Sequence, residues 1–179
     1  MVESFQTYDA EGALLELVPR AVVHREGLWH RAVNVFLFHP DGSLLLQQRS
    51  SDKDICPGTW DLSVAEHLMP GEDYVDAAHR GLSEELSIKG VPLKPLGDEL
   101  VWRFGDPDLN IKDNEFQQCF AGVTDKTARV DGVEVVSVRL ISLGDLEVTM
   151  RESPDLFTPW IVGLADRVGL FTGGIHRNL

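Results

Sequence analysis

The stretch "EDYVDAAHRGLSEELSI", residues 72–88, constrains the fold most, because a helical hydrophobic pattern and a cluster of charges coincide in it. Its apolar residues recur at steps of three and four: Val75, Ala78, Leu82 and Leu86. This spacing predicts an amphipathic helix of roughly three to four turns. Asp73 stands where such a helix needs an N-cap, and the following "KGVPLKP" ends it.

The charges of this predicted helix favour a metal-binding role. Arg80 and Glu84 lie four residues apart and share a face, while Glu85 flanks the apolar stripe. Together with Glu72 near the start of the helix, they suit a hard divalent cation such as Mg²⁺, which prefers oxygen ligands. A solvated helix face with an ordinary Arg–Glu pair is the alternative. Gly81 costs this helix up to about 1 kcal/mol relative to alanine, so it calls for an explanation.

The rest of the chain predicts strands around this helix. Asp41-Gly42 lies between two apolar runs and is typical of a hairpin. The expected strands cover residues 32–38, 43–49, 99–104, 115–123 and 133–143, with a short extended piece within 56–64. Short helices are expected at 143–150 and 156–168, followed by a loose tail at 171–179. This order lacks regular βαβ alternation and predicts an α+β fold, or a mixed sheet with helices on both faces.

Composition bounds the class of protein. The 179 residues suit a single domain (1–179) with a core at about 20–168. The net charge of −13 argues against non-specific binding to nucleic acid or to an anionic membrane surface. Apolar runs such as "VNVFLF" are too short to span a bilayer, and "MVESFQTYDAEG" lacks the features of a signal peptide, so we expect a cytoplasmic protein. Cys56 and Cys119 are expected as free thiols rather than a disulfide.

The helical stretch resembles the Nudix box. The matching residues are Glu72, Arg80, Leu82, Glu84, Glu85 and Ile88. Three positions depart from the pattern: Glu66 replaces its leading glycine, Gly81 the glutamate of its Arg-Glu pair, and Ser87 its late glycine. The resemblance implies the Nudix fold, in which a mixed β-sheet is sandwiched between helices, and a small-molecule diphosphate substrate.

The departure at Gly81 bears on the chemistry. In the Nudix family the replaced glutamate commonly ligates a metal or serves as the base for water, so its loss removes charge neutralisation or a proton acceptor. The resemblance still implies that Glu84 and Glu85 hold Mg²⁺. Glu66 is a candidate for the missing carboxylate.

A more specific resemblance covers the chain from about Arg20 to Trp160. The segments "QQRSSDKDICPGTWDLSVAEH", "GEDYVDAAHR", "DNEFQQCF" and "FTPW" look like the type I isopentenyl diphosphate isomerase branch of the Nudix fold. The implied metal ligands are His24, His30, His67, Asp113 and Glu115, a set that suits a first-row divalent metal such as Mn²⁺ or Zn²⁺. The implied diphosphate contacts are Arg20, Arg49 and Lys53, and Trp160 would line the apolar pocket.

Two departures from this branch concern proton transfer. Isomerases of the branch use a cysteine two residues before the histidine that corresponds to His67, and this chain has Ala65 there. They also use a tyrosine, for which Phe104 is the counterpart. Neither a methyl group nor a phenyl ring can shuttle a proton, whereas allylic isomerisation needs an acid and a base. Cys56 lies too far along the chain to be taken as a substitute.

Three functions therefore remain open. The first is a Mg²⁺-dependent hydrolase of an isoprenoid diphosphate or nucleoside diphosphate derivative, with Glu84, Glu85 and Glu115 as catalytic residues. The second is an isomerase that interconverts isopentenyl and dimethylallyl diphosphate. The third is a non-catalytic binder of phosphorylated ligands. The lost isomerase groups favour the hydrolase.

Overall fold

The computed structural model describes residues 2–130, 132–172 and 175. The first half contains β1 (Ser4–Tyr8), β2 (Leu14–Pro19), α1 (Arg20–Glu26), β3 (Trp29–Phe38), β4 (Leu44–Arg49), β5 (Trp60–Asp61), β6 (Val64–His67) and α2 (Tyr74–Leu86). The second half contains β7 (Lys94–Pro95), β8 (Leu100–Asp106), β9 (Ile111–Val123), β10 (Val135–Ile141), α3 (Leu143–Glu152), the 3₁₀ turn η1 (Pro154–Leu156) and α4 (Pro159–Arg167). The strands and helices expected beyond residue 30 are therefore present, with longer β8 and β9 than predicted.

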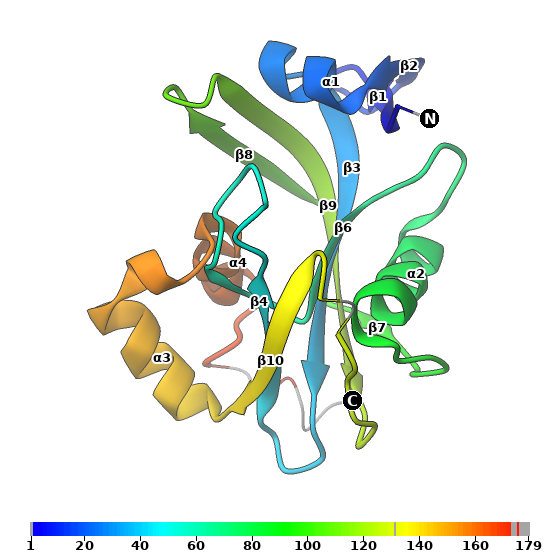
Figure 1. Cartoon of the computed structure of the whole chain (residues 1–179). Helices are drawn as coiled ribbons and strands as arrows, with labels where there is room; N and C mark the ends of the chain where they lie inside the picture. The colour runs from blue at the N-terminus through cyan, green and yellow to red at the C-terminus, as the bar shows by residue number, and fades with distance from the viewer. Residues whose placement is uncertain (1, 131, 173–174, 176–179) are drawn as a thin grey trace.

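All the strands belong to one mixed sheet (Figure 1). β3 and β9 run parallel over the whole length of β3, from the Trp29–Asn114 pair to the Phe38–Val123 pair. β7 and β8 extend the sheet beyond β9 in the antiparallel sense. β3 pairs with β4 only at its last residue, Phe38, which lies opposite Leu44 next to the predicted Asp41-Gly42 turn. Earlier in β3, residues 32–35 pair with β6 instead. The two central strands thus separate, and the chain from β5 to β6 lies between them.

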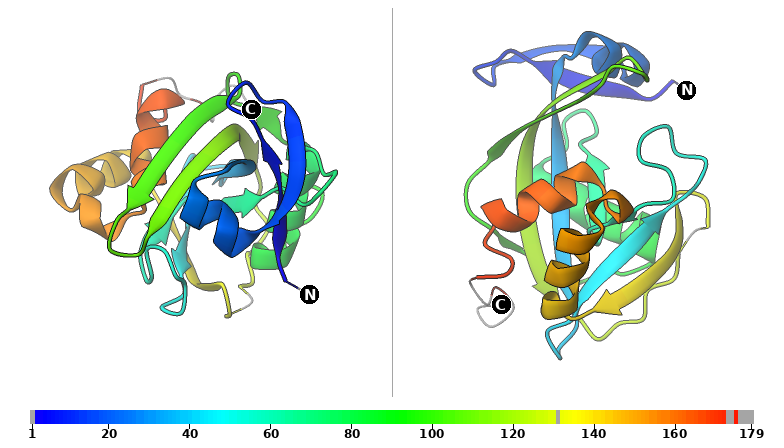
Figure 2. Two further views of the ribbon diagram at one scale, coloured as in Figure 1. Left: turned by 90° about the horizontal axis from the view of Figure 1, so that it is seen from above. Right: turned by 90° about the vertical axis from the view of Figure 1, so that its left-hand side faces the viewer.

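Helices cover both faces of this sheet, as the α+β prediction requires (Figures 1 and 2). On one face, Phe36 and Leu46 of the sheet pack in a buried cluster with Ile161 and Leu164 of α4, and α3 contributes Leu146. On the other face, α2 packs on Val33, Val35 and Leu37. Burial of these apolar side chains is the main stabilising term of the fold. The fold is that of a mixed sheet between helices.

The N-terminal residues form a layer that the sequence did not predict. β1 and β2 make an antiparallel hairpin, and α1 follows directly at Arg20 (Figure 2). Tyr8 of β1 pairs with Trp29 of β3, which ties the hairpin to the sheet. These two strands precede the predicted core, which was expected to begin at about residue 20. The predicted loose tail at 171–179 falls mainly outside the described residues.

Helix α2 begins and ends close to the predicted positions. Asp73 caps it, since its Oδ1 accepts a hydrogen bond of 2.9 Å from the backbone N–H of Asp76. The predicted stripe was wrong at Val75, which is 37% exposed, and Ala77 takes its place in the core. Cys56 and Cys119 are free thiols, as expected.

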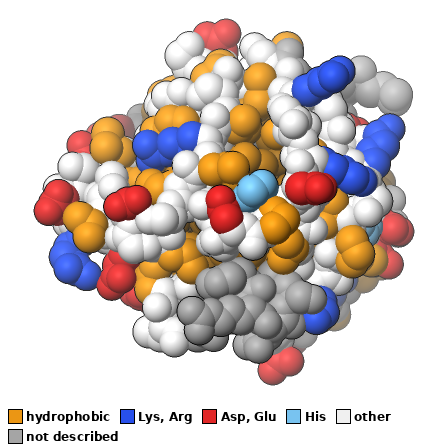
Figure 3. All heavy atoms as spheres, turned by 90° about the horizontal axis from the view of Figure 1, so that it is seen from below, with side chains coloured by type: hydrophobic (Ala, Val, Ile, Leu, Met, Phe, Trp, Pro, Cys, Tyr) orange, Lys and Arg blue, Asp and Glu red, His pale blue; other side chains and the backbone are white. Residues whose placement is uncertain are grey.

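The end of the molecule at the β3–β4 turn has a mixed surface. In Figure 3, acidic and basic side chains are scattered among hydrophobic ones, with no continuous basic field on this face. None of the helices in the described ranges has the length and hydropathy needed to cross a bilayer.

Gly81 marks a close approach between α2 and β6. A Cβ atom at this position would lie 2.5 Å from Cγ1 of Val64 and 3.4 Å from Cβ of Glu66. Val64 is fully buried and β-branched, so it has little freedom to move aside. A glutamate side chain at position 81 therefore has no room while β6 keeps this position.

We predict that Gly81→Ala lowers the free energy of unfolding by about 1–2 kcal/mol. Overpacking costs about 1–3 kcal/mol, and the better helix propensity of alanine returns up to about 1 kcal/mol. Urea denaturation measures the change. Gly144→Ala in α3 is the control, because its added Cβ meets nothing within 4 Å. Combining Gly81→Ala with Val64→Ala should cost less than the sum of the two; an additive result would contradict the steric explanation.

Candidate metal centre and substrate cavity

Three neighbouring strands bring the predicted site residues onto one face of the sheet. Side chains alternate along β3, so His30, Ala32 and Asn34 point to the same side. The parallel pairing places Glu115 opposite His30, and Gln117 opposite Ala32. The antiparallel partner β6 places His67 opposite Ala32, and Ala65 opposite Asn34. The register of three strands therefore assembles residues that are far apart in the sequence.

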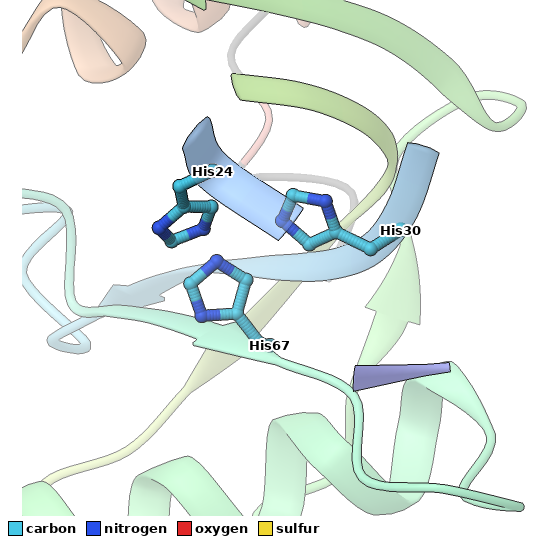
Figure 4. Close-up of side chains that lie close together, drawn as sticks. All are labelled: His24, His30 and His67. Atoms are coloured by element: carbon cyan, nitrogen blue, oxygen red, sulfur yellow. The ribbon is translucent and has the colours of Figure 1, made fainter. Parts of the chain in front are cut away.

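The three predicted histidines meet above this face. His24 comes from α1, His30 from β3 and His67 from β6, and their rings are directed at one another in Figure 4. The imidazole Nε2 of His30 lies 3.4 Å from Oδ1 of Asp113 and 3.5 Å from Oε1 of Glu115. Nε2 of His67 lies 3.2 Å from the same oxygen of Glu115, and Nε2 of His24 lies 4.0 Å from Oδ1 of Asp113. All five predicted ligands thus converge, and we call them the His/acid centre.

Burial and mutual charge perturb the titration of this centre. Burial, with the neighbouring His67 and His30, lowers the pKa of His24 to about 3. Burial would also lower the pKa of His30, but the carboxylates of Glu115 and Asp113 outweigh it and raise that pKa. Burial and the negative Glu115 raise the pKa of Asp113 to about 6. The pKa of Glu115 is lowered, because its histidine partners outweigh the effect of burial.

The donor set of the His/acid centre fits a divalent cation. Nε2 of His24, Nε2 of His30 and Oδ1 of Asp113 are buried and have no hydrogen-bond partner in the part of the chain that the structure describes. Buried polar atoms without partners are costly, and these three face one another. A cation bound by imidazole nitrogens and carboxylate oxygens would satisfy them together. Such mixed ligation suits first-row divalent metals.

A cavity of about 70 Å³ opens beside the His/acid centre. Arg20, Arg49 and Trp160, three of the four residues predicted to bind substrate, line it. Lys53 is absent from the lining of this cavity and instead pairs with Glu134. The remaining lining comes from the His/acid centre, β3, β6, Ile55 and Gln117.

Asp61 organises one wall of this cavity, and sequence reasoning missed it. Its carboxylate is fully buried and accepts hydrogen bonds from Trp160 Nε1 at 2.8 and 2.9 Å and from Thr158 Oγ1 at 3.0 Å. Nη1 of Arg49 lies 3.4 Å away and the backbone N–H of Leu62 also donates. Burial raises the pKa of Asp61, and the positive Arg49 opposes that shift. A single aspartate after "GTW" carries no signal in the sequence, because its side-chain partners come from two distant segments, at Arg49 and at Thr158 and Trp160.

Arg80 binds most of the acidic residues near α2. It donates to both oxygens of Glu72 at 2.9 Å, to the carbonyl of His67 at 2.8 Å and to Glu84 at 3.3 Å. Its Nη1 also lies 2.9 Å from Glu66. These contacts raise the pKa of Arg80, with the hydrogen bonds to Glu72 as the main cause. Glu72 and Glu66 are therefore already neutralised by a cation of the chain.

The structure does not bring Glu84 and Glu85 together. Successive helical residues point about 100° apart, so the Glu84 side chain is 57% exposed on the Arg80 face, whereas Glu85 is buried. No Lys or Arg of the described ranges forms an ion pair with Glu85. Burial and the nearby Glu66 raise its pKa well above the usual range, and a hydrogen bond from Gln47 opposes this shift. Glu66 alternates with Ala65 and His67 along β6, so it faces α2 rather than the His/acid centre.

Comparison with known proteins agrees with this geometry. The family model described as NUDIX domain matches residues 28–161, three quarters of the chain. The chain belongs to the Nudix family. Isopentenyl-diphosphate Delta-isomerase from Burkholderia multivorans is 33% identical over 95% of both chains. The same enzyme from Pectobacterium atrosepticum is 34% identical over 76% of this chain and 75% of that one. The chain thus lies in the Nudix branch that resembles type I isopentenyl diphosphate isomerase.

Solved structures agree on the Nudix fold alone. The crystal structure of DR0079 from Deinococcus radiodurans superimposes with a TM-score of 0.75 at 20% identity, covering 93% of this chain and 99% of that one. The MutT protein from Methanosarcina mazei Go1 gives a TM-score of 0.62 at 19% identity, covering 79% and 93%. These identities carry no information about substrate.

The two positions that depart from the isomerase branch, Ala65 and Phe104, lie at or near the cavity beside the His/acid centre. Ala65 lines the cavity next to Asn34, at the position where the branch would place its cysteine. Phe104 on β8 packs edge-on against Trp160, with ring centroids 6.3 Å apart. Neither side chain carries a titratable group.

We predict that the Nudix protein binds a divalent metal through the His/acid centre. Titration calorimetry of chelator-treated protein with Mn²⁺ or Zn²⁺ measures the affinity. His30→Ala or Glu115→Gln should weaken it by more than the roughly 10–100-fold that loss of an outer-shell partner causes. His39→Ala, at the β3–β4 turn, is the control and should bind as the parent does. Equal affinity in all variants would contradict the assignment.

Metal affinity should also fall as the pH drops from about 7 to 5. Ligands bind in their deprotonated form, so protons compete with the metal. The pKa of Asp113 is raised to about 6, which places its protonation in that range, and the pKa of His30 is raised above its usual value, so protons also compete for its ring there. His24, with a pKa of about 3, stays neutral throughout. Calorimetry at several pH values tests this, and a flat profile would contradict it.

Asp61→Asn should destabilise the protein and weaken substrate binding. An amide offers a single acceptor oxygen where donors from Leu62, Thr158, Trp160 and Arg49 converge. We expect a loss of about 1–3 kcal/mol in the free energy of unfolding, measured in urea. Asp155→Asn, an exposed position in η1, is the control and should be neutral. A stable Asp61→Asn variant would show that Asp61 does not organise this wall.

Proposed function

We propose that this protein is a divalent-metal-dependent hydrolase of a small organic diphosphate, either an isoprenoid diphosphate or a nucleoside diphosphate derivative. The observation that carries the proposal is the buried His/acid centre, which borders a cavity that Arg20 and Arg49 also line. The same cavity offers no titratable group at Ala65. It is therefore better suited to bind a diphosphate than to move protons on carbon.

Hydrolysis requires charge neutralisation and a proton acceptor. A divalent cation in the His/acid centre, or Mg²⁺ at Glu85, would supply positive charge to the phosphate oxygens and acidify a bound water. Arg49 is held by Asp61 and by the carbonyl of Ile55, so its guanidinium is oriented before substrate binds. With the cation in the His/acid centre, Glu85 would be free to accept the proton of the attacking water, and burial raises its pKa in the direction that a base requires. Water oxygen bonds to phosphorus, the bridging P–O bond breaks, and inorganic phosphate and an organic monophosphate result.

Isomerisation of isopentenyl diphosphate is the second candidate. It is favoured by the 33% identity to isopentenyl-diphosphate Delta-isomerase from Burkholderia multivorans over nearly the whole chain. Glu115 and Trp160, which the isomerase resemblance implies as proton carrier and carbocation contact, both line the cavity. Isomerisation moves a proton onto one carbon and takes another from a second, and Glu115 accounts for only one of these transfers.

A single incubation separates the candidates. We expect the Mg²⁺- or Mn²⁺-loaded protein to release phosphate from at least one member of a panel of isopentenyl, dimethylallyl and nucleoside diphosphates. Run in D₂O with isopentenyl diphosphate, the reaction should leave no deuterium in C2 or C4. Deuterium uptake above background would favour the isomerase. Binding in calorimetry without release or exchange would leave a non-catalytic binder.

Variants test the roles of the residues in this reaction. Glu85→Gln and Glu115→Gln should each lower phosphate release at least about 100-fold, in the range seen when a general base or a charge-stabilising group is lost. Glu84→Gln is the matched control on the same helix and should retain activity, because its side chain is exposed. Glu85→Gln with parental activity would contradict the proposal. Ala65→Cys combined with Phe104→Tyr should raise deuterium uptake if the cavity accepts isopentenyl diphosphate.

A further inference from the structure

Two buried amide side chains line the cavity and have no part in the proposed hydrolysis. Asn34 on β3 and Gln117 on β9 are each 2% exposed. Both border the cavity beside the His/acid centre. Polar side chains this deeply buried are normally fully hydrogen-bonded. These two are not.

Each amide leaves one polar atom without a partner among the residues that the structure describes. Nε2 of Gln117 donates to Oε2 of Glu115, which fixes the orientation of the amide and leaves Oε1 as an unpartnered acceptor. Nδ2 of Asn34 is buried and donates to no atom of the described chain. Asn34 and Gln117 are diagonal neighbours in the register of β3 and β9, so the cavity wall has a buried donor and a buried acceptor on adjacent strands.

The residues around the two amides leave space next to them. Ala32 lies opposite Gln117 in the register of β3 and β9, and Ala65 lies opposite Asn34 in the register of β3 and β6. Both alanines line the cavity. Short side chains beside two unpartnered amides create room for a ligand group rather than for protein packing.

The chemistry of the amides selects the ligand group. An apolar group in this space would leave Nδ2 of Asn34 and Oε1 of Gln117 without partners, at a cost that proteins avoid. A hydroxyl both donates and accepts, so one hydroxyl can bond to Oε1 of Gln117 and to Nδ2 of Asn34. An amide or a sugar hydroxyl pair on the ligand would do the same.

We propose that Asn34 and Gln117 determine specificity for a diphosphate whose organic part carries a hydroxyl or amide group, and that they select against a purely hydrocarbon isoprenoid chain. This inference rests on the proposed diphosphate site and narrows its substrate class. Of the two classes considered above, it favours a nucleoside or other hydroxylated diphosphate. A site built to bind a hydroxyl rejects the analogue that lacks it, because its own polar groups are then left unpaired.

The experiment compares ligands that differ by one hydroxyl. Calorimetry with Mg²⁺-loaded protein gives the dissociation constants of dimethylallyl diphosphate, of its 4-hydroxy derivative, and of ADP. We expect at least one hydroxyl-bearing compound to bind about 10–100-fold more tightly than dimethylallyl diphosphate. Equal or weaker binding of both hydroxyl-bearing compounds, or no binding of any of the three, would overturn the proposal.

Variants test whether a preference for hydroxyl-bearing ligands comes from the two amides. Asn34→Leu and Gln117→Met keep the side-chain size and remove the hydrogen-bonding groups, so the preference should fall to about 1–3-fold. Gln118→Met is the matched control, because Gln118 is the next residue of β9 and bonds to the carbonyl of Gly97 instead. Metal content and the urea midpoint are measured for each variant, since Gln117 also donates to Glu115. A preference that persists in Asn34→Leu would overturn the assignment.

The binding ratio and the release of phosphate report on different claims. A hydroxyl preference without any phosphate release would contradict the proposed hydrolysis and leave the specificity inference standing. Phosphate release at equal rates from dimethylallyl diphosphate and from its 4-hydroxy derivative, with equal affinities, would contradict the specificity inference and leave the proposed hydrolysis standing.

Discussion

The parallel pairing of β3 with β9 is the interaction on which the site depends. It sets His30 beside Glu115 and Ala32 beside Gln117. A shift of β9 by one residue in this register would turn Glu115 and Gln117 to the face of the sheet opposite His30 and Ala32. The separation of β3 from β4 adds the second requirement, because it lets β6 bring His67 to the same face. The arrangement of the His/acid centre, the amides and the cavity thus follows from backbone hydrogen bonds rather than from any local sequence motif.

The approach of α2 to β6 explains why the helix carries a glycine. With Val64 only 2.5 Å from a Cβ at position 81, the helix can lie this close to the sheet because that side chain is absent. The same closeness lets Arg80 reach the carbonyl of His67 and the carboxylate of Glu66. The carboxylate that the Nudix pattern has at position 81 is therefore lost for a packing reason. Glu66 on β6 places a different carboxylate near this part of α2, and that carboxylate is paired with Arg80.

The sequence was most informative where a local rule operates. The period of α2, its cap at Asp73 and the Asp41-Gly42 turn follow from spacing and turn chemistry. The β1–β2 hairpin was missed because its apolar residues do not mark a buried face: Leu14, Leu15 and Leu17 are all more than half exposed. The five residues of the His/acid centre were predicted through family resemblance, since no local pattern joins residues on α1, β3, β6 and β9. The roles of three residues could not be predicted from the sequence: Asp61, Asn34 and Gln117. Each role depends on tertiary hydrogen bonds, or on their absence, which no sequence pattern encodes.

The cavity joins an isomerase-like metal centre to a wall with different chemistry. The His/acid centre keeps all five residues that the isomerase resemblance implies, so the part of the site that handles charge is retained. The wall that would meet the carbon chain has Ala65, which cannot transfer a proton, beside Asn34, which can bind a polar group. Retention of one part with replacement of the other is the pattern expected when a scaffold keeps its diphosphate chemistry and changes the organic group that it accepts. The unpartnered amides indicate that the favoured organic group carries a hydroxyl, because a buried donor and acceptor stabilise a hydroxyl and disfavour a hydrocarbon.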